Sequence, residues 1–310
     1  MNSSSALWHN PTYVSTVTSV VAFFVIIGAV VYYMQLRNPK WIGVWASIKS
    51  WVINSPVIFF FAALPAPWPL VFITLVAISG SKTFYQMTGM YHRSFFVWIT
   101  YLFLILQGYF IFHGHSEVYN IMPMLFFACI VLIPIFRNSA VHMIQYMALA
   151  LMNFILIGWG FMYLARLVLW PDGPLLVLHL AILFEFCESC NYTITRAFGT
   201  HKPFQAITTR FSIEGFLVSA ALTILLAWGL RFMLPYHTQP YWLLSGITVA
   251  IFGRIGGLLL SVIRRDLGIK ESGIFIIGRD DIISRLDKAM FAAPAFYFGY
   301  WLLSSVWHVR

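Results

Sequence analysis

The sequence predicts an all-α, polytopic integral membrane protein, a helix bundle with about ten transmembrane spans. Hydrophobic residues make up 60% of the 310 positions and charged residues only 9%, a balance unlike that of soluble domains. The apolar runs repeatedly reach the roughly 20 residues that a helix needs to cross the hydrocarbon layer. They are continuous rather than alternating, which excludes the strands of a membrane barrel.

Ten apolar segments predict the individual spans. The expected ranges are 13–36, 48–66, 68–81, 94–113, 117–136, 144–168, 174–195, 215–235, 241–264 and 289–307. The second and third are short and are divided only by Pro65, Ala66 and Pro67. From the sequence they fit either two spans, one broken span or a re-entrant pair.

The basic side chains predict the orientation of these spans. If the first span begins outside the cytoplasm, 15 of the 19 Lys and Arg residues fall in one alternating set of loops, as expected for cytoplasmic loops. Both termini then face away from the cytoplasm, and two crossings lie between Lys49 and Lys82. Because these loops account for the net charge of +9, we expect no nucleic-acid partner.

The acidic side chains divide the chain into two parts. Eight of the ten lie within positions 185–287. We therefore expect residues 1–173 to form an N-terminal membrane scaffold and residues 174–310 to form a C-terminal membrane domain that carries the site.

Several ionisable residues fall within the predicted spans of the second part, and three of them lie away from the span ends or share one helix face. Charge within a span is costly and by default marks a functional site, which singles out Glu185, Glu188 and Arg254. The alternative is that the two glutamates simply reach water near the end of their span. In the same region, the GxxGG run of Gly253, Gly256 and Gly257 favours close helix packing over ligand binding.

Two polar segments, Asn191–Gly215 and Ser261–Asp287, interleave Arg and Lys with carboxylates. A phosphate-handling site requires this mixture, because cations hold phosphate groups and carboxylates hold a divalent metal between them. A salt-bridged surface loop would have a similar composition, so only the spacing of these residues can distinguish it from a phosphate-handling site.

The spacing matches a known pattern. The second segment follows SxxKRxxxxKDxGxxxPGHGGxxDRxD at Ser261, Arg264, Arg265, Lys270, Glu271, Gly273, Gly278, Arg285 and Asp287. The region of the first follows DxxAYxxGRxFGKxxxxPxxSPxKTxEG at Glu188, Tyr192, Arg196, Phe198, Gly199, Arg210, Ser212, Glu214 and Gly215. These motifs resemble the phosphatidate cytidylyltransferase (CDP-diacylglycerol synthase) family, and Lys82–Gly89 is weakly similar to a further family segment.

The resemblance implies a membrane enzyme that transfers CMP from CTP to phosphatidic acid or a related lipid phosphate. Pyrophosphate is released, and the product, CDP-diacylglycerol, serves phospholipid biosynthesis. The implied location is the bacterial inner (cell) membrane, with the site on the cytoplasmic side. The expected partners are the anionic lipid, CTP and the membrane, with a homodimer as a further option, and Mg²⁺ is the expected cofactor if the chain is active.

The resemblance also implies roles for individual residues. The catalytic residues would be Glu188, Glu271 and Asp287. The substrate-binding residues would be Arg196, Lys202, Arg210, Ser212, Glu214, Ser261, Arg264, Arg265, Lys270 and Arg285. The metal ligands would be Glu188, Glu271, Asp280, Asp281 and Asp287.

The chain departs from the pattern where the family's metal ligands are concentrated. Gly257 and Ser284 stand in the place of two aspartates, and losing two carboxylates weakens a two-metal site. Asp280 and Asp281 could supply the missing charge, or the chain could use a different substrate pair. Alternatively, it is a catalytically silent relative that binds anionic lipid or a membrane partner, or a transporter or other fold.

Overall fold

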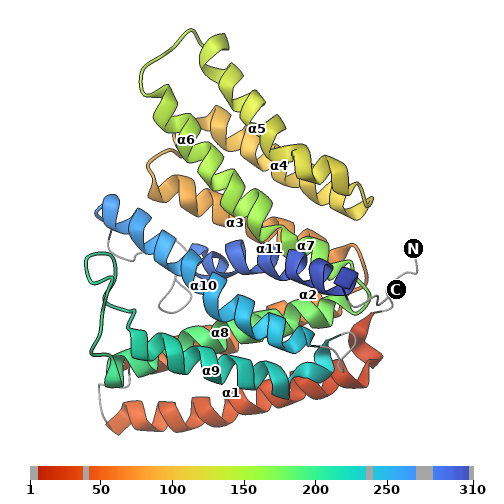
Figure 1. The fold of residues 1–310 in the computed structure, drawn as a ribbon, viewed down its shortest axis with the longest axis vertical. Helices are drawn as coiled ribbons and strands as arrows, with labels where there is room; N and C mark the ends of the chain where they lie inside the picture. Colours follow the sequence, from red (N-terminus) through yellow and green to blue (C-terminus); the bar gives the residue numbers. More distant parts are fainter. Residues whose placement is uncertain (1–5, 38–41, 235–239, 270–281, 307–310) are drawn as a thin grey trace.

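The computed structural model describes residues 6–37, 42–234, 240–269 and 282–306, which form a bundle of helices (Figure 1). These residues contain no strand, so the all-α prediction is confirmed. The longer helices are α1 (Pro11–Arg37), α2 (Ile42–Ala63), α3 (Trp68–Met87), α4 (Ser94–Phe112), α5 (Ser116–Phe136), α6 (Met143–Asn153), α8 (Gly173–Phe198), α9 (Ile213–Gly229), α10 (Tyr241–Asp266) and α11 (Ile283–Val306). The shorter helices are η1 (Leu7–His9), η3 (Phe154–Phe161), α7 (Tyr163–Val168) and η4 (Arg231–Met233).

Within the described residues, 7 helical stretches are long and apolar enough to cross a membrane. They are α1, α3, α4, α5, α8, α10 and the continuous stretch Met143–Val168. Large apolar side chains stand on the outside of the bundle, among them Phe136 and Ile144, which are 82% and 79% exposed. Such a surface fits hydrocarbon rather than water, so the chain is an integral membrane protein. The number of spans, about ten, stays a prediction.

The proline-rich break between the second and third predicted spans separates two complete helices. Helix α2 has 22 residues and α3 has 20, and Pro67 immediately precedes α3. Helix α3 continues to Met87, beyond the predicted end at residue 81, because Ser81 and Thr83 are buried against neighbouring helices rather than exposed at a helix end. Each helix is thus about as long as a full crossing requires.

Two predicted boundaries in the second part of the chain are wrong. Helix α9 ends at Gly229 rather than near residue 235. Helix α11 begins at Ile283 rather than at residue 289, because Asp287 and Lys288 form its first turns and are buried rather than exposed in a loop.

Helices α8, α9, α10 and α11 pack side by side, while α4, α5 and α6 lie at the top of the view (Figure 1). Glycines of α10 allow close approach: a Cβ on Gly246 would lie 3.0 Å from the Ile224 Cα of α9, and one on Gly256 would lie 2.6 Å from the Asp287 carbonyl carbon of α11. This confirms close helix packing at Gly256. Helix α11 also contacts the first part of the chain, because Arg166 Nη2 donates to Tyr297 Oη at 2.7 Å. The division at residues 173/174 stays a prediction.

Candidate functional site

A cleft that is partly open to solvent lies at one end of the bundle. Its walls are the last part of α8, the segment before α9, the last part of α10 and the first turns of α11. The two polar segments of the sequence therefore meet in space. Of the predicted site residues, Glu188, Arg210, Ser261, Arg264 and Asp287 line this cleft.

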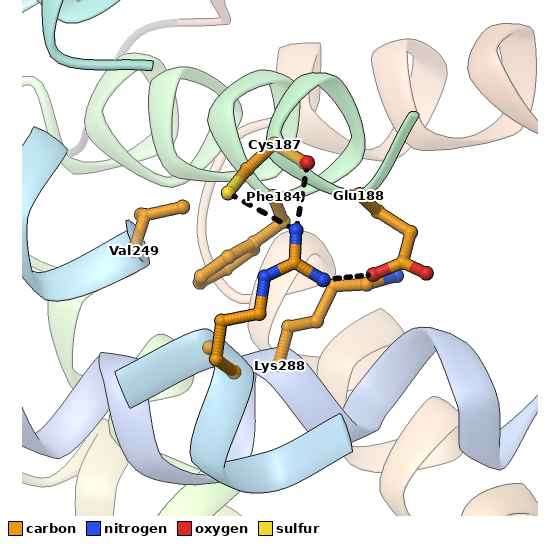
Figure 2. Close-up of a pocket in the computed structure, with 7 residues that line it drawn as sticks. Phe184, Cys187, Glu188, Val249 and Lys288 are labelled. Atoms are coloured by element: carbon orange, nitrogen blue, oxygen red, sulfur yellow. Dashed lines mark hydrogen bonds and ion pairs between the residues drawn. The ribbon is translucent and has the colours of Figure 1, made fainter. Parts of the chain in front are cut away.

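The Glu188 carboxylate is held by an arginine of the facing helix (Figure 2). Arg254 Nη1 donates to Glu188 Oε2 at 3.0 Å, and Arg254 Nη2 donates to the Cys187 carbonyl oxygen at 2.8 Å. The Arg254 side chain is only 12% exposed, whereas that of Glu188 is 41% exposed. A guanidinium inside the bundle therefore neutralises the carboxylate that the motif assigns to metal binding, and it joins α8 to α10.

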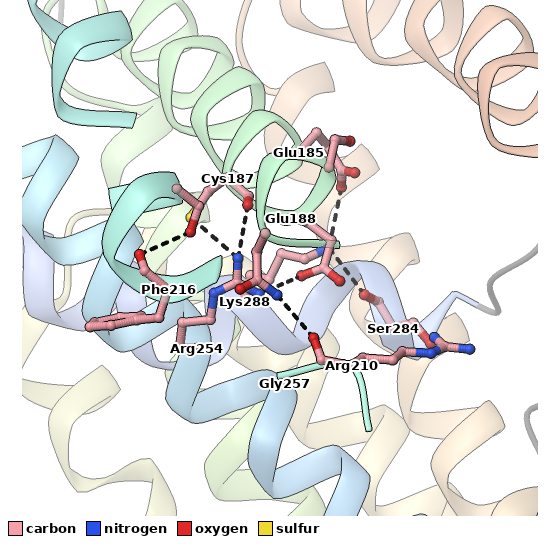
Figure 3. A network of polar contacts seen from close by, with 12 residues as sticks. Glu185, Cys187, Glu188, Arg210, Phe216, Arg254, Gly257, Ser284 and Lys288 are labelled. Atoms are coloured by element: carbon pink, nitrogen blue, oxygen red, sulfur yellow. Dashed lines mark hydrogen bonds and ion pairs between the residues drawn. The ribbon is translucent and has the colours of Figure 1, made fainter. Parts of the chain in front are cut away.

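A second cation enters the cleft from α11 (Figure 3). Lys288 Nζ lies 3.6 Å from Glu185 Oε1 and donates to the Ser284 carbonyl oxygen at 3.4 Å. Both side chains of the Lys288–Glu185 pair are largely buried, at 10% and 20% exposure. Glu185 thus pairs with a lysine inside the bundle, so the alternative in which it simply reaches water is not what the structure shows.

Asp287 is buried at the contact between α10 and α11. Its residue is 6% exposed, and its Oδ1 atom has no hydrogen-bond partner. At the first substituted position, a Cβ on Gly257 would lie 3.6 Å from Asp287 Oδ2. At the second, Ser284 Oγ accepts a hydrogen bond from Arg264 Nη2 at 2.6 Å. The two positions that have lost their carboxylates, 257 and 284, therefore both line the cleft beside the remaining aspartate.

The segment before α9 is fixed to α8 by polar contacts. Asn191 Nδ2 donates to the Arg210 carbonyl oxygen at 3.2 Å, and the hydroxyls of Thr195 and Ser212 are 2.9 Å apart. Ser212 also caps α9 by accepting from the Gly215 amide at 3.0 Å. A side chain at Gly215 would meet both Thr195 and Ser212, so this position needs glycine.

Glu214 organises the same segment from outside the cleft. Its carboxylate accepts from the Thr200 hydroxyl at 2.6 Å and from the His201 amide at 3.1 Å, and it pairs with the His201 ring. The bonds from Thr200 and then from His201 lower the pKa of the Glu214 carboxyl to about 2. Substrate binding by Ser212 and Glu214 stays a prediction, since their observed contacts stabilise the loop.

The remaining predicted residues lie around the cleft or outside the described residues. Arg196 and Arg265 are exposed, while Lys202 and Arg285 are half-buried, and none of the four lines the cleft. Their roles stay predictions. Four further predicted residues lie outside the described residues, namely Lys270, Glu271, Asp280 and Asp281.

Metal binding by the protein stays a prediction, because the described part of the site contains only two of the five predicted ligands, Glu188 and Asp287. Within that part, no three or more His, Cys, Asp or Glu side chains gather closely enough to hold an ion. The Glu188 carboxylate is already paired with Arg254. Asp287 Oδ1 has no hydrogen-bond partner, but a Mg²⁺ centre requires several oxygen ligands.

Two important residues of the cleft, Arg254 and Lys288, are absent from the residue roles that the motifs imply. Arg254 was signalled by its charge within a span, but no motif position gave it a partner. Lys288 directly follows the final aspartate of the second motif, and it escaped notice because the helix was expected to start one residue later. The available signals were the charge of Arg254 within a span and the lysine that directly follows the motif aspartate.

Comparisons with known proteins show which family the chain resembles. The profile of the Cytidylyltransferase family matches residues 45–303. The chain is 30% identical over 149 residues to a phosphatidate cytidylyltransferase of Staphylococcus haemolyticus, covering 47% of this chain and 56% of that one. With the same coverage, it is 26% identical to a phosphatidate cytidylyltransferase of Staphylococcus aureus. It is 31% identical over 128 residues to the uncharacterized protein YnbB of Escherichia coli K12, covering 41% of this chain and 42% of that one.

The pairwise matches span about half the length of these relatives, whereas the family profile spans most of this chain. The profile includes every element that lines the cleft, from the end of α8 to the start of α11. The chain therefore belongs to the Cytidylyltransferase family.

Proposed function

We propose that the protein is a phosphatidate cytidylyltransferase that joins CTP to phosphatidic acid in a membrane. The observation that carries this proposal is the cleft at one end of the bundle, which Arg210, Arg254, Arg264 and Lys288 line together with Asp287. A lipid can bring its phosphate to such a site while its acyl chains stay in hydrocarbon. The family match favours this function over a silent binding protein.

The reaction follows from the chemistry of the two substrates. An oxygen of the lipid phosphate attacks the α-phosphorus of CTP, and a new P–O bond forms between them. The bond from the α-phosphorus to the oxygen that bridges it to the β-phosphorus breaks, and pyrophosphate leaves with that oxygen. The products are CDP-diacylglycerol and pyrophosphate.

The cleft residues serve this reaction by binding and positioning. Two polyanions repel each other, so fixed cations such as Arg264 and Lys288 lower the cost of bringing them together. Asp287 Oδ1 lacks a donor in the described structure and would accept one from a bound substrate. Mg²⁺ remains part of the proposal only as an ion that arrives with the triphosphate or is held by Glu271, Asp280 and Asp281.

The orientation also belongs to this proposal. The cleft is lined by the last parts of α8 and α10, next to loops that the sequence assigns to the basic set, so we place it at the cytoplasmic face of a bacterial inner membrane. CTP would enter from the cytoplasm. A homodimer stays an untested expectation.

The proposal is tested with purified protein in mixed micelles that contain phosphatidic acid and CTP labelled in the cytosine ring. The expected result is labelled CDP-diacylglycerol, with its rate reduced at least tenfold by Arg264→Gln. The matched control is Arg231→Gln, because this arginine lies past the far end of α9, over the Trp228 ring, and should leave the rate unchanged. Folded wild-type protein that forms no labelled lipid would refute the proposed function.

A further inference from the structure

The cleft contains two cations, each of which is paired with a carboxylate of α8. Arg254 contacts Glu188 at 3.0 Å, and Lys288 lies 3.6 Å from Glu185 (Figure 3). Both cations are nearly buried, and both also line a small adjoining cavity between α8, α10 and α11. The positive charge that a divalent ion could supply is therefore already present on side chains.

These charges lie well inside the helices. Arg254 precedes the end of α10 by 12 residues, which is about 18 Å along the helix axis, and Glu188 precedes the end of α8 by 10 residues, about 15 Å. Ionisable groups at such positions are costly and are by default functional. A purely structural ion pair that joins α8 to α10 is the competing explanation.

Three buried atoms of the cleft lack hydrogen-bond partners, namely Asn191 Oδ1, Arg254 Nε and Asp287 Oδ1, and the last two have opposite requirements. Arg254 Nε is a donor without an acceptor, and Asp287 Oδ1 is an acceptor without a donor. Buried groups of this kind are rare in native structures because leaving them unbonded is costly. A singly protonated phosphate monoester carries both acceptor oxygens and a P–OH donor, so it could satisfy both atoms.

We propose that Arg254 and Lys288 bind the phosphate monoester of phosphatidic acid, and that this binding requires no divalent cation. The arginine offers planar donors suited to phosphate, and the lysine adds a point charge. The lipid phosphate is favoured over the nucleotide because Arg254 lies deep along α10 and both cations are nearly buried between helices, within reach of a headgroup that remains anchored in the bilayer. The choice of phosphatidic acid rests on the proposed function, whereas metal-independent binding of a phosphate group does not.

The test measures the Kd of short-chain phosphatidic acid in neutral-detergent micelles, without nucleotide, in EDTA and in Mg²⁺. The wild-type Kd should agree within twofold between the two conditions. Arg254→Gln and Lys288→Gln should each raise it at least tenfold, whereas Arg231→Gln should not change it. Unfolding midpoints of all variants establish that they are folded, and phosphatidylcholine, inorganic phosphate and CTP serve as comparison ligands.

Glu188→Gln separates ligand binding from a purely structural role. If Arg254 binds phosphate, removing its competing carboxylate leaves the affinity for phosphatidic acid equal or higher. If the pair only joins α8 to α10, Glu188→Gln and Arg254→Gln should impair binding alike, and the inference is refuted. An Arg254→Gln effect on CTP alone would equally refute the lipid assignment.

The outcomes also separate this inference from the proposed function. Loss of phosphatidic acid binding in EDTA would overturn the inference even if CMP transfer occurs. Persistent binding in EDTA by a protein that makes no CDP-diacylglycerol would support the inference and refute the proposed function.

Discussion

Replacing Gly256 by alanine tests whether the contact between α10 and α11 positions the site. The added Cβ would lie 2.6 Å from the Asp287 carbonyl carbon and closer still to its oxygen. Carbon atoms in contact lie about 3.5–4.0 Å apart, so the two helices would have to separate by roughly 1 Å. Because the obstructing atoms belong to the backbone, no side-chain rotation relieves the clash, and overpacking of this kind costs about 1–3 kcal/mol.

The assay compares thermal unfolding in detergent with binding of phosphatidic acid. Gly256→Ala should lower the apparent unfolding midpoint and weaken binding, since Asp287 and Lys288 move away from Arg254. Gly253→Ala is the matched control: its Cβ would lie 3.6 Å from the Lys288 Cβ, an ordinary contact, and alanine favours the helix by up to about 1 kcal/mol. If both variants behave like the wild type, the described packing of α10 against α11 is wrong.

Three further predictions address the metal, the loop and the orientation. Combining Gly257→Asp with Ser284→Asp should create a Mg²⁺ site beside the existing aspartate, so millimolar Mg²⁺ should raise the unfolding midpoint of the variant more than that of the wild type; equal responses would contradict this. Because the folded pKa of Glu214 is about 2, below its ordinary 4.5, its stabilisation of residues 199–212 is complete above pH 4.5 and is lost as pH falls towards 2. Amide exchange in this loop, corrected for intrinsic rates, should show that loss, and Glu214→Gln should abolish the pH dependence. Single cysteines should be labelled from outside the cell at Asp172 but not at Lys202, and the reverse pattern would overturn the orientation.

Most of the helices could be predicted from apolar length alone, because the bilayer sets that length. The expected 94–113 and 241–264 correspond closely to α4 (Ser94–Phe112) and α10 (Tyr241–Asp266). Prediction failed where polar residues are buried by neighbouring helices. Ser81 was taken as the end of a span and Lys288 as part of a loop, although both are buried inside helices.

The motifs identified the elements that meet at the cleft, but not how their charges pair. Spacing brought Glu188, Arg264 and Asp287 to one site, which the structure supports. The Arg254–Glu188 pair joins residues 66 positions apart on different helices, and no local pattern indicates such a contact. The position of Gly257 beside Asp287 likewise depends on the crossing of α10 and α11.

The most direct test of the central claim follows two labels of CTP in one reaction with phosphatidic acid and purified protein. We predict that an α-phosphate label enters the lipid as CDP-diacylglycerol, while a γ-phosphate label stays in water as pyrophosphate. The two labelled products should form in equal amounts. Arg231→Gln should behave like the wild type, and Arg264→Gln should reduce both products together. An α-label that never reaches the lipid, or a γ-label that does, would contradict cytidylyl transfer.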